Sequence, residues 1–467
     1  MARALTPDEA ELARSTVARA RAAMDAIADY DQATVDRLCQ AVAWSTANMD
    51  TAIRLANMSV DESGMGQREP NRRGKVLGIL RDALRQKSMG VIEEIPEKGI
   101  VKYAKPAGVI VSLIPVTSPY ITPIGIAIYA VKCKNAVIFS PHPSSRKTTN
   151  ETVRLLRAAL VAQGAPADIL QCIETPSIPL ANELMATGDL TIATGGPAMV
   201  KAAYSSGKPA YGVGAGNASM VIDDTADIDD AARNTRISKT NDYGSGCSAD
   251  GNLIVDDGIY DRFLAALQAE GGYLVEGAEK AMLQAAYWDA EGRRTADTIA
   301  RPAEVIAAKA GIALPAGKTF FIVPETHIGR AHPFSTEKLG VVLSIFRYRG
   351  WDHALDLVRQ IFETGGKGHS CGIYSFNDDH IHQLALVAPV SRIMVRQVQS
   401  RSNAGNFTNG MPQTSSMGCG IWGGNITNEN VSLKHYMNVT WVSRPIAEDK
   451  PSEAELFGEF YNTPVPA

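Results

Sequence analysis

A cysteine in a turn of small residues is the first candidate for chemistry in this sequence. Cys247 follows Gly244, Ser245 and Gly246, and it precedes residues 252–255, which have the pattern of a strand. Small neighbours leave room for a substrate, and a turn can aim the sulfur into a cleft. A thiolate in such a turn can attack a carbonyl, because backbone N–H groups lower its pKa and stabilise an oxyanion. The pattern therefore indicates a nucleophile.

The other cysteines lack this setting. They are scattered, without a Cys-x-x-Cys pair or the spacing of zinc ligands, which is typical of small buried side chains in a reducing compartment: Cys39, Cys133, Cys172, Cys371 and Cys419. The run Asp378 to His382 is rich in acids and histidines. It is more typical of a solvated helix start, so we expect no metal.

Composition bounds the possible partners. The chain has 467 residues, 45% of them hydrophobic, and a net charge of −4. This length allows two or three domains. The absence of a basic block argues against nucleic acid and membrane surfaces as partners, and no apolar run approaches the roughly 20 residues that cross a bilayer. The N-terminus also lacks the apolar core of a signal peptide. We expect a cytoplasmic protein.

Hydrophobic periodicity predicts an α/β protein. Thr6 opens a helical pattern with a capping hydroxyl, a proline and an acid, and a second helical pattern covers 35–56. A hairpin is expected over 91–105. Apolar strands then alternate with helices from about 108 to 223, which predicts a doubly wound α/β domain. A second α/β unit is expected from Ile228.

Two glycine-rich segments are candidates for cofactor binding. The segment 193–197 ends a strand and opens a helix, so Thr194, Gly195 and Gly196 could face a dinucleotide, although a tight turn explains them equally well. The segment 212–216 resembles a dinucleotide fingerprint, but it continues into the expected strand 219–223 rather than a helix. Gly214 is retained as a candidate cofactor contact.

Several longer motifs occur in a fixed order. They are SPHP (140–143), ATGGP (193–197), GVGAGN (212–217), Cys247 in its turn, EKL (337–339), GHS (368–370) and GCGIWGGN (418–425). Together they resemble the CoA-acylating aldehyde dehydrogenases, including that half of the bifunctional aldehyde–alcohol dehydrogenases, over about residues 10 to 445. The chain is identified as a member of this family on these motifs.

The resemblance implies a domain organisation. It predicts the aldehyde dehydrogenase fold, with a Rossmann-like cofactor domain over 1–90 and 107–227 and an α/β catalytic domain over 228–431. Strands within 91–106 and 432–450 resemble the oligomerisation strands of the family, which implies a homodimer or homotetramer.

The resemblance also implies a reaction. Cys247 attacks the aldehyde, hydride passes to a nicotinamide, and coenzyme A takes the acyl group from the resulting thioester. Glu337 would contact the cofactor ribose. His369 would position or deprotonate the CoA thiol, with a hydrogen-bonded core histidine as the alternative. The oxyanion would rest on the Cys247 N–H and the Thr117 hydroxyl.

The absence of a carboxylate in one segment indicates that CoA, rather than water, accepts the acyl group. Hydrolytic relatives carry a glutamate in Glu-Leu-Gly-Gly that activates water, whereas the matching segment here, 212–215, contains no acid. The thioester should therefore await the CoA thiol. Ser118 also departs from acylating relatives, which tend to have asparagine there. A hydrolytic or phosphorylating dehydrogenase and an inactive scaffolding relative remain as alternatives.

The nicotinamide is not decided by the sequence. Ser140 and His142 follow a strand end where the adenosine ribose is expected. Arg146 and Lys147 would suit the 2′-phosphate of NADP, or they are surface charges, so NADP and NAD both remain open.

Two arginines suggest an anionic aldehyde. Arg396 stands where acetaldehyde-specific relatives usually have asparagine, and Arg401 follows it. A guanidinium suits a sulfonate or carboxylate, although Arg396 could instead pair with an acid of the protein. The sequence resembles the acylating sulfoacetaldehyde dehydrogenases most. CoA-acylating succinate-semialdehyde and acetaldehyde dehydrogenases are the alternatives, so the expected partners are a small anionic aldehyde or its acyl-CoA.

Overall fold

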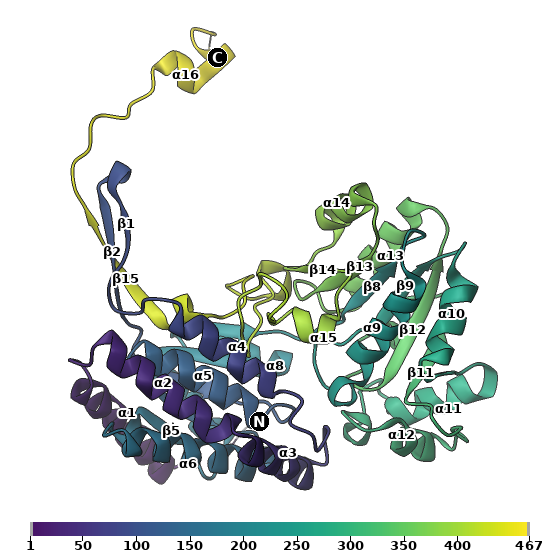
Figure 1. The fold of residues 1–467 in the computed structure, drawn as a ribbon, viewed down its shortest axis with the longest axis horizontal. Coiled ribbons are helices and arrows are strands. Elements are labelled where there is room, and N and C mark those ends of the chain that lie inside the picture. The colour runs from purple at the N-terminus through teal and green to yellow at the C-terminus, as the bar shows by residue number, and fades with distance from the viewer. Residues whose placement is uncertain (1–2, 465–467) are drawn as a thin grey trace.

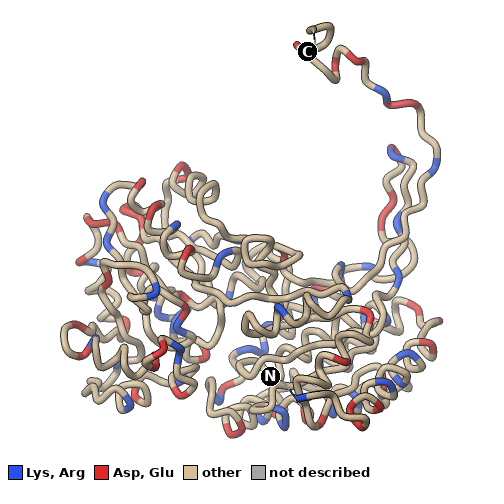
Figure 2. Tube along the Cα trace, turned by 180° about the vertical axis from the view of Figure 1, so that it is seen from behind, with Lys and Arg blue, Asp and Glu red and all other residues tan. Residues whose placement is uncertain are grey.

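The computed structural model describes residues 3–464 as two α/β lobes, a projecting antiparallel sheet and a C-terminal extension (Figure 1). No helix within this range is both long and apolar enough to cross a membrane. Acidic and basic residues are interspersed over both lobes (Figure 2), as expected from the small net charge.

The N-terminal lobe is built on a five-stranded parallel sheet. Its order is β5-β4-β3-β6-β7, and the strands are β3 (Val109–Leu113), β4 (Ala136–Ser140), β5 (Leu170–Cys172), β6 (Leu190–Thr194) and β7 (Ala210–Val213). The strand order reverses between β3 and β6. Such a reversal opens a crevice at the carboxyl ends of the strands, where α/β proteins bind ligands.

Helices cover both faces of this sheet. They are α1 (Pro7–Ala26), α2 (Gln32–Ala47), α3 (Met49–Ser63), α4 (Arg73–Leu84), α5 (Ile121–Lys132), α6 (Arg146–Ala162), α7 (Ile178–Thr187) and α8 (Pro197–Tyr204). The capping box predicted at Thr6 is present at the start of α1. Every residue of α5 is buried between the sheet and its neighbouring helices, which anchors the core of this lobe.

The second lobe contains a seven-stranded parallel sheet. Its order is β10-β11-β12-β9-β8-β13-β14, and the strands are β8 (Ser219–Ile222), β9 (Asn252–Asp256), β10 (Gly272–Leu274), β11 (Phe320–Pro324), β12 (Val342–Tyr348), β13 (Cys371–Tyr374) and β14 (Ile393–Val395). The helices are α9 (Ile228–Thr240), α10 (Tyr260–Ala269), α11 (Gly277–Tyr287), α12 (Ala303–Ala310), α13 (Trp351–Thr364), α14 (Asp378–Val387) and α15 (Gln399–Ser402).

The sequence-based domain boundary at residue 227 is wrong. β8 pairs with β9 and β13, so it is a central strand of the second lobe. The chain therefore crosses between lobes at 214–218, before β8 rather than after it. The expected catalytic segment 228–431 also ends too late, because Gln413 already packs on the N-terminal lobe: its N–H donates to Asp82, and its carbonyl accepts from the Tyr129 hydroxyl.

The projecting sheet joins distant parts of the chain. β1 (Gly90–Ile95) and β2 (Ile100–Pro106) form the predicted hairpin, and β15 (Met437–Ser443) pairs antiparallel with β2. β15 is an edge strand with exposed apolar side chains, among them Val439 and Trp441. The chain then runs outward to α16 (Glu453–Phe457) (Figure 1). Oligomerisation through this sheet remains a prediction.

Candidate active site

The Cys247 turn begins with an uncommon backbone. Asp242, Tyr243 and Gly244 have φ values of 50°, 51° and 68°, so three consecutive residues are left-handed. For the two non-glycine residues this conformation costs about 1–2 kcal/mol each. Such strain persists only where surrounding contacts fix it. The turn is therefore held in place by the residues around it.

Asp242 supplies those contacts. Its carboxylate accepts hydrogen bonds from the Gln67 N–H (2.7 Å), the Ser245 hydroxyl (2.7 Å) and the Arg72 guanidinium. Arg72 also donates to the Thr117 carbonyl (3.0 Å) and the Ser118 hydroxyl (3.2 Å). Arg72 thus links the Thr117 loop of one lobe to the Cys247 turn of the other.

His369 contacts the candidate nucleophile directly. Its Nε2 lies 3.0 Å from the Cys247 Sγ, and its Nδ1 lies 2.8 Å from the Ser370 hydroxyl. The imidazole is fully buried, and burial lowers its pKa to about 3, with the nearby Arg392 charge acting in the same direction. A neutral imidazole at this distance can accept a hydrogen bond from the thiol, and it can serve as a base only when the pKa of Cys247 is lowered. The structure therefore places His369 at the reacting atom.

The Cys247 thiol is protonated in this state. Burial raises its pKa to about 12, and the charges of Glu337 and Cys419 add to this effect. Lys75 and Arg392 oppose it. A half-buried thiol with this balance of charges needs both a base and additional positive charge before it becomes a nucleophile.

Gly216 fits tightly against the nucleophile. A Cβ on Gly216 would lie 2.0 Å from the Cys247 carbonyl oxygen, so only glycine fits there. The Gly216 N–H donates to Glu337 Oε1 at 3.0 Å, and Arg294 Nη1 lies 3.7 Å from Glu337 Oε2. Burial raises the pKa of Glu337. Glu337 is thus part of the same site as Cys247, and the ribose contact expected for it remains a prediction.

The glycine segment that crosses between the lobes brings no acid to the thiol. β7 runs into 214–218, where a Cβ on Gly214 would stand 3.5 Å from Cys419 Sγ. No helix follows the segment, in agreement with the rejection of a dinucleotide fingerprint. The residues 212–215 contain no carboxylate to activate water.

The candidate cofactor residues lie at neighbouring strand ends. Ser140 ends β4, Thr194 ends β6, and Gly195 and Gly196 lead into α8 as the sequence predicts. The Thr194 hydroxyl lies 3.0 Å from the Ser416 hydroxyl. A Cβ on Gly196 would meet no atom within 4 Å, so the approach to the α8 N-terminus is open. This arrangement at a switch point fits a dinucleotide.

The start of α6 bears on the choice of nicotinamide. His142 lies in the turn before α6, and burial lowers its pKa. Glu62 already accepts from the N–H groups of Lys147 (2.8 Å) and Thr148 (2.7 Å). A 2′-phosphate would therefore depend on the side chains of Arg146 and Lys147 rather than on these amides.

The structure does not bring Arg396 to the thiol. Arg396 follows β14, at the carboxyl end of the sheet, whereas His369 precedes the neighbouring β13 at the amino end. Its guanidinium donates to the Ser375 carbonyl and lies 4.4 Å from the Phe376 ring centroid. The expectation that Arg396 faces the acyl pocket is corrected accordingly. Its partner is also not the protein carboxylate that was the alternative.

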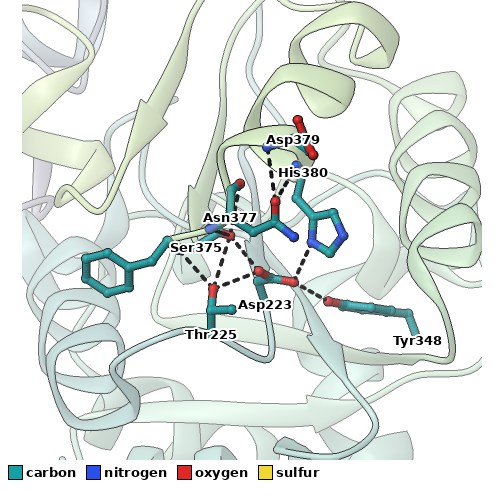
Figure 3. Close-up of polar contacts among 8 residues, drawn as sticks. Asp223, Thr225, Tyr348, Ser375, Asn377, Asp379 and His380 are labelled. Atoms are coloured by element: carbon teal, nitrogen blue, oxygen red, sulfur yellow. Dashed lines mark hydrogen bonds and ion pairs between the residues drawn. The ribbon is translucent and has the colours of Figure 1, made fainter.

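A polar cluster around Asp223 lies at the carboxyl end of this sheet (Figure 3). The Asp223 carboxylate accepts from the hydroxyls of Ser375 (2.5 Å) and Thr225 (2.9 Å) and contacts His380 Nδ1 at 2.9 Å. His380 also stacks on Trp351, with ring centroids 3.9 Å apart. Within residues 3–464 there is no group of three or more possible metal ligands.

Arg392 supports the site, whereas Arg401, which the sequence suggested, does not. Arg401 is exposed on α15. Arg392, which the sequence analysis did not select, is 5% exposed and immediately precedes β14. It donates to the carbonyls of His369 (3.1 Å), Gly418 (2.6 Å) and Asn428 (3.1 Å). It therefore supports the histidine that contacts the nucleophile.

One positional rule would have found these residues. Cys247 precedes β9, Glu337 precedes β12, His369 precedes β13 and Arg392 precedes β14. All of these strands are parallel, so the four residues lie together at the amino ends of the strands of one sheet. In the sequence, each of these residues stands shortly before a short run of mostly apolar residues.

Comparison with known proteins gives the same chemistry. The model of the aldehyde dehydrogenase family matches residues 8–442. A sulfoacetaldehyde dehydrogenase of an Acholeplasma species is 43% identical over 95% of this chain and 93% of its own length. A sulfoacetaldehyde dehydrogenase (acylating) of Bilophila wadsworthia is 39% identical over 95% of this chain and 97% of its own. A succinate-semialdehyde dehydrogenase (acetylating) of Clostridium kluyveri is 34% identical over 95% and 98%.

Solved structures share the fold. An acetylating aldehyde dehydrogenase of Geobacillus thermoglucosidasius superposes with a TM-score of 0.90 at 34% identity, over 95% of this chain and 99% of that one. A propionaldehyde dehydrogenase of Rhodopseudomonas palustris, solved with bound CoA and an acylated cysteine, gives a TM-score of 0.81 at 26% identity, over 92% and 97%.

Proposed function

The chain belongs to the aldehyde dehydrogenase family and is an oxidoreductase with acylating relatives; from this premise we propose that it converts an anionic aldehyde to its acyl-CoA thioester, reversibly, with a nicotinamide cofactor. The observation that carries the proposal is the 3.0 Å contact between the Cys247 Sγ and the His369 Nε2. It joins a half-buried thiol, in a turn of small residues, to a neutral imidazole.

Three residues of the chain carry the first steps of this reaction. His369 Nε2 takes the Cys247 proton as the sulfur attacks the aldehyde carbon. The Cys247 N–H and the Thr117 hydroxyl stabilise the resulting oxyanion. Ser140, Thr194 and Gly196 would hold a nicotinamide cofactor, which would supply the hydride acceptor and a positive charge that lowers the pKa of the thiol. The product of these steps is a thioester on Cys247.

Release of the acyl group requires a second thiol. The proton that His369 took from Cys247 is first released to solvent. His369 then accepts the proton of the CoA thiol, the CoA sulfur attacks the thioester, and Cys247 leaves as a thiolate that takes this proton back from His369. Water competes poorly, because 212–215 holds no carboxylate that could activate it. The solved relative with bound CoA and an acylated cysteine supports this order.

The relatives support a sulfonated substrate. Two named for sulfoacetaldehyde are 43% and 39% identical to the chain, whereas one named for succinate semialdehyde is 34% identical. We therefore take sulfoacetaldehyde, giving sulfoacetyl-CoA, as the substrate. Succinate semialdehyde and acetaldehyde are the second and third choices. A structure with NADP⁺ is also among the relatives, and initial rates with NAD and NADP decide the cofactor.

Turnover without CoA tests the reaction class. With sulfoacetaldehyde and either nicotinamide, steady turnover should require CoA. Without CoA, about one equivalent of reduced nicotinamide per active site should appear and then stop. The absorbance of reduced nicotinamide, followed by stopped flow, measures both. Sustained turnover without CoA at a similar rate would assign the enzyme to the hydrolytic class instead.

A further inference from the structure

Two cations act on the Cys247 thiol, and they differ in what else they bind. They are Lys75 and Arg392, and both lower the pKa of the thiol. Both terminal nitrogens of Arg392 donate to backbone carbonyls, so its charge is fixed in the protein framework. Lys75 is half-buried. Among the residues from 3 to 464, none forms a hydrogen bond or ion pair with its ammonium group.

The position of Lys75 on α4 aims it at the Cys247 turn. Residues three and four apart lie on one face of a helix, so Lys75 shares a face with Arg72 and Ile79. Arg72 reaches Thr117 and Ser245, which flank the nucleophile. Ile79 is fully buried on the same face. Lys75 therefore lies on the side of α4 from which Arg72 reaches the Cys247 turn.

We propose that Lys75 binds the negatively charged tail of the aldehyde and so determines the preference for anionic substrates. This inference rests on the proposed function and names the residue that recognises the substrate. In sulfoacetaldehyde the sulfonate is one methylene from the carbonyl carbon, so its receptor must lie close to the Cys247 sulfur. A lysine ammonium without a protein partner meets that need, and charge-assisted bonds are strong in a partly desolvated site.

The electrostatic setting supports this role. Burial, together with the Arg72 charge, lowers the pKa of Lys75 to about 8, and Cys247 acts in the opposite direction. An anion beside the ammonium would raise that pKa again and relieve the cost of its burial. In the free enzyme, kcat/KM for an anionic aldehyde should therefore fall as the pH rises through about 8. A neutral aldehyde, measured in parallel, corrects for the titration of Cys247.

Substitution of Lys75 provides the test. Lys75→Gln and Lys75→Arg are compared with Lys87→Gln, which removes an exposed lysine just beyond α4. Sulfoacetaldehyde, succinate semialdehyde and propanal are each assayed with CoA. We expect Lys75→Gln to lower kcat/KM by about 10- to 100-fold more for the anionic aldehydes than for propanal, whose loss reports only the weaker activation of Cys247. Lys75→Arg should keep part of the preference, and Lys87→Gln should match the wild type.

A second measurement does not depend on turnover. Isethionate, an unreactive sulfonate, should slow alkylation of Cys247 by iodoacetamide in the wild type and in Lys87→Gln, but not in Lys75→Gln. Retained nicotinamide binding shows that the variant is folded. If the wild type prefers the anionic aldehydes but Lys75→Gln lowers all rates equally, the Lys75 role is overturned and the function stands. If the wild type prefers propanal, both are overturned.

Discussion

At the scale of single residues, the reaction depends most on the thiol of Cys247. Cys247→Ser keeps the size of the side chain but replaces a thiol with a hydroxyl, which is a far weaker nucleophile near neutral pH. We expect turnover to fall by at least about 1,000-fold, with nicotinamide binding nearly unchanged. Steady-state rates and a binding titration measure the two effects. A serine variant with most of the wild-type activity would exclude Cys247 as the nucleophile.

His369 should make the protein sensitive to acid. Its pKa is about 3 in the fold and near its usual 6.5 when unfolded. Between these values the unfolded chain binds the extra proton, so stability is fully present above about 6.5 and is lost as pH falls toward 3. At pH 5 the loss is about 2 kcal/mol.

His369→Gln tests this linkage. The variant has no group that titrates in this window at that position. Its melting temperature should therefore fall less between pH 7 and pH 5 than that of the wild type, whatever its absolute stability. Thermal unfolding at fixed ionic strength measures the difference. Equal acid shifts in both proteins would show that His369 is already charged or exposed.

The arginines show what single residues cannot reveal by type alone. Arg396 and Arg392 flank the same short strand, β14, and the sequence offers no reason of composition to prefer one. The two arginines lie at opposite ends of this strand, and the nucleophile lies at the amino end of the sheet only. The choice therefore required the strand bounds and the position of Cys247.

At the scale of elements, the bond between Arg72 and Asp242 holds the Cys247 turn. These side chains are 18% and 10% exposed. Asp242→Asn should destabilise the protein by about 2–4 kcal/mol, because it leaves a mostly buried guanidinium without its counter-charge. It should also lower kcat, because the strained turn loses its anchor. Asp61→Asn is the control, since Asp61 and its partner Arg68 are 65% and 57% exposed.

Thermal unfolding and kcat distinguish these variants. Asp61→Asn should stay within about 0.5 kcal/mol of the wild type. If Asp242→Asn were as mild in both measurements, the turn would not depend on the contact with Arg72.

Most elements could be predicted from sequence, and the exceptions have physical causes. β9 stands out as an apolar run, and its predicted bounds, 252–255, agree closely with the structure. α5 is buried on all sides, so it lacks the polar face that makes a helix recognisable. β7 is short and contains Gly212, which weakens any strand signal.

The position of β8 in a sheet was beyond local sequence. Its residues predict a strand correctly. An apolar strand, however, could pair equally well in either of the two parallel sheets, so its residues do not indicate which sheet contains it. Only the pairing of β8 with β9 and β13 assigns it to the second lobe. The site was predictable in its nucleophile and its histidine, which motifs mark. It was not predictable in Lys75, whose role depends on how α4 packs across the lobes.

At the scale of the whole molecule, the open edge of β15 predicts self-association. An exposed edge strand with apolar side chains is a template for pairing with another chain. Trp441 is 59% exposed on β15, and Trp44 is 64% exposed on α2. We expect a dimer or tetramer that Trp441→Asp shifts toward monomer. Trp44→Asp removes an equally exposed tryptophan elsewhere and should leave the assembly unchanged.

Light scattering coupled to size exclusion at micromolar concentration measures the assembly. A monomeric wild type, or equal dissociation by both tryptophan variants, would remove the sheet from consideration as the interface.

The tight contact between Gly216 and Cys247 has a mechanical consequence. Residues 214–218 connect the two lobes, and Gly216 in this connection lies against the carbonyl of the nucleophile. Arg72 spans the same gap from the other side. Cys247 and His369 belong to the same sheet, so rotation of one lobe about this connection would keep them together and move the Thr117 loop and α4 relative to the sulfur. The oxyanion contact proposed for Thr117 and the contact with the substrate tail proposed for Lys75 would therefore form or break together when the lobes move.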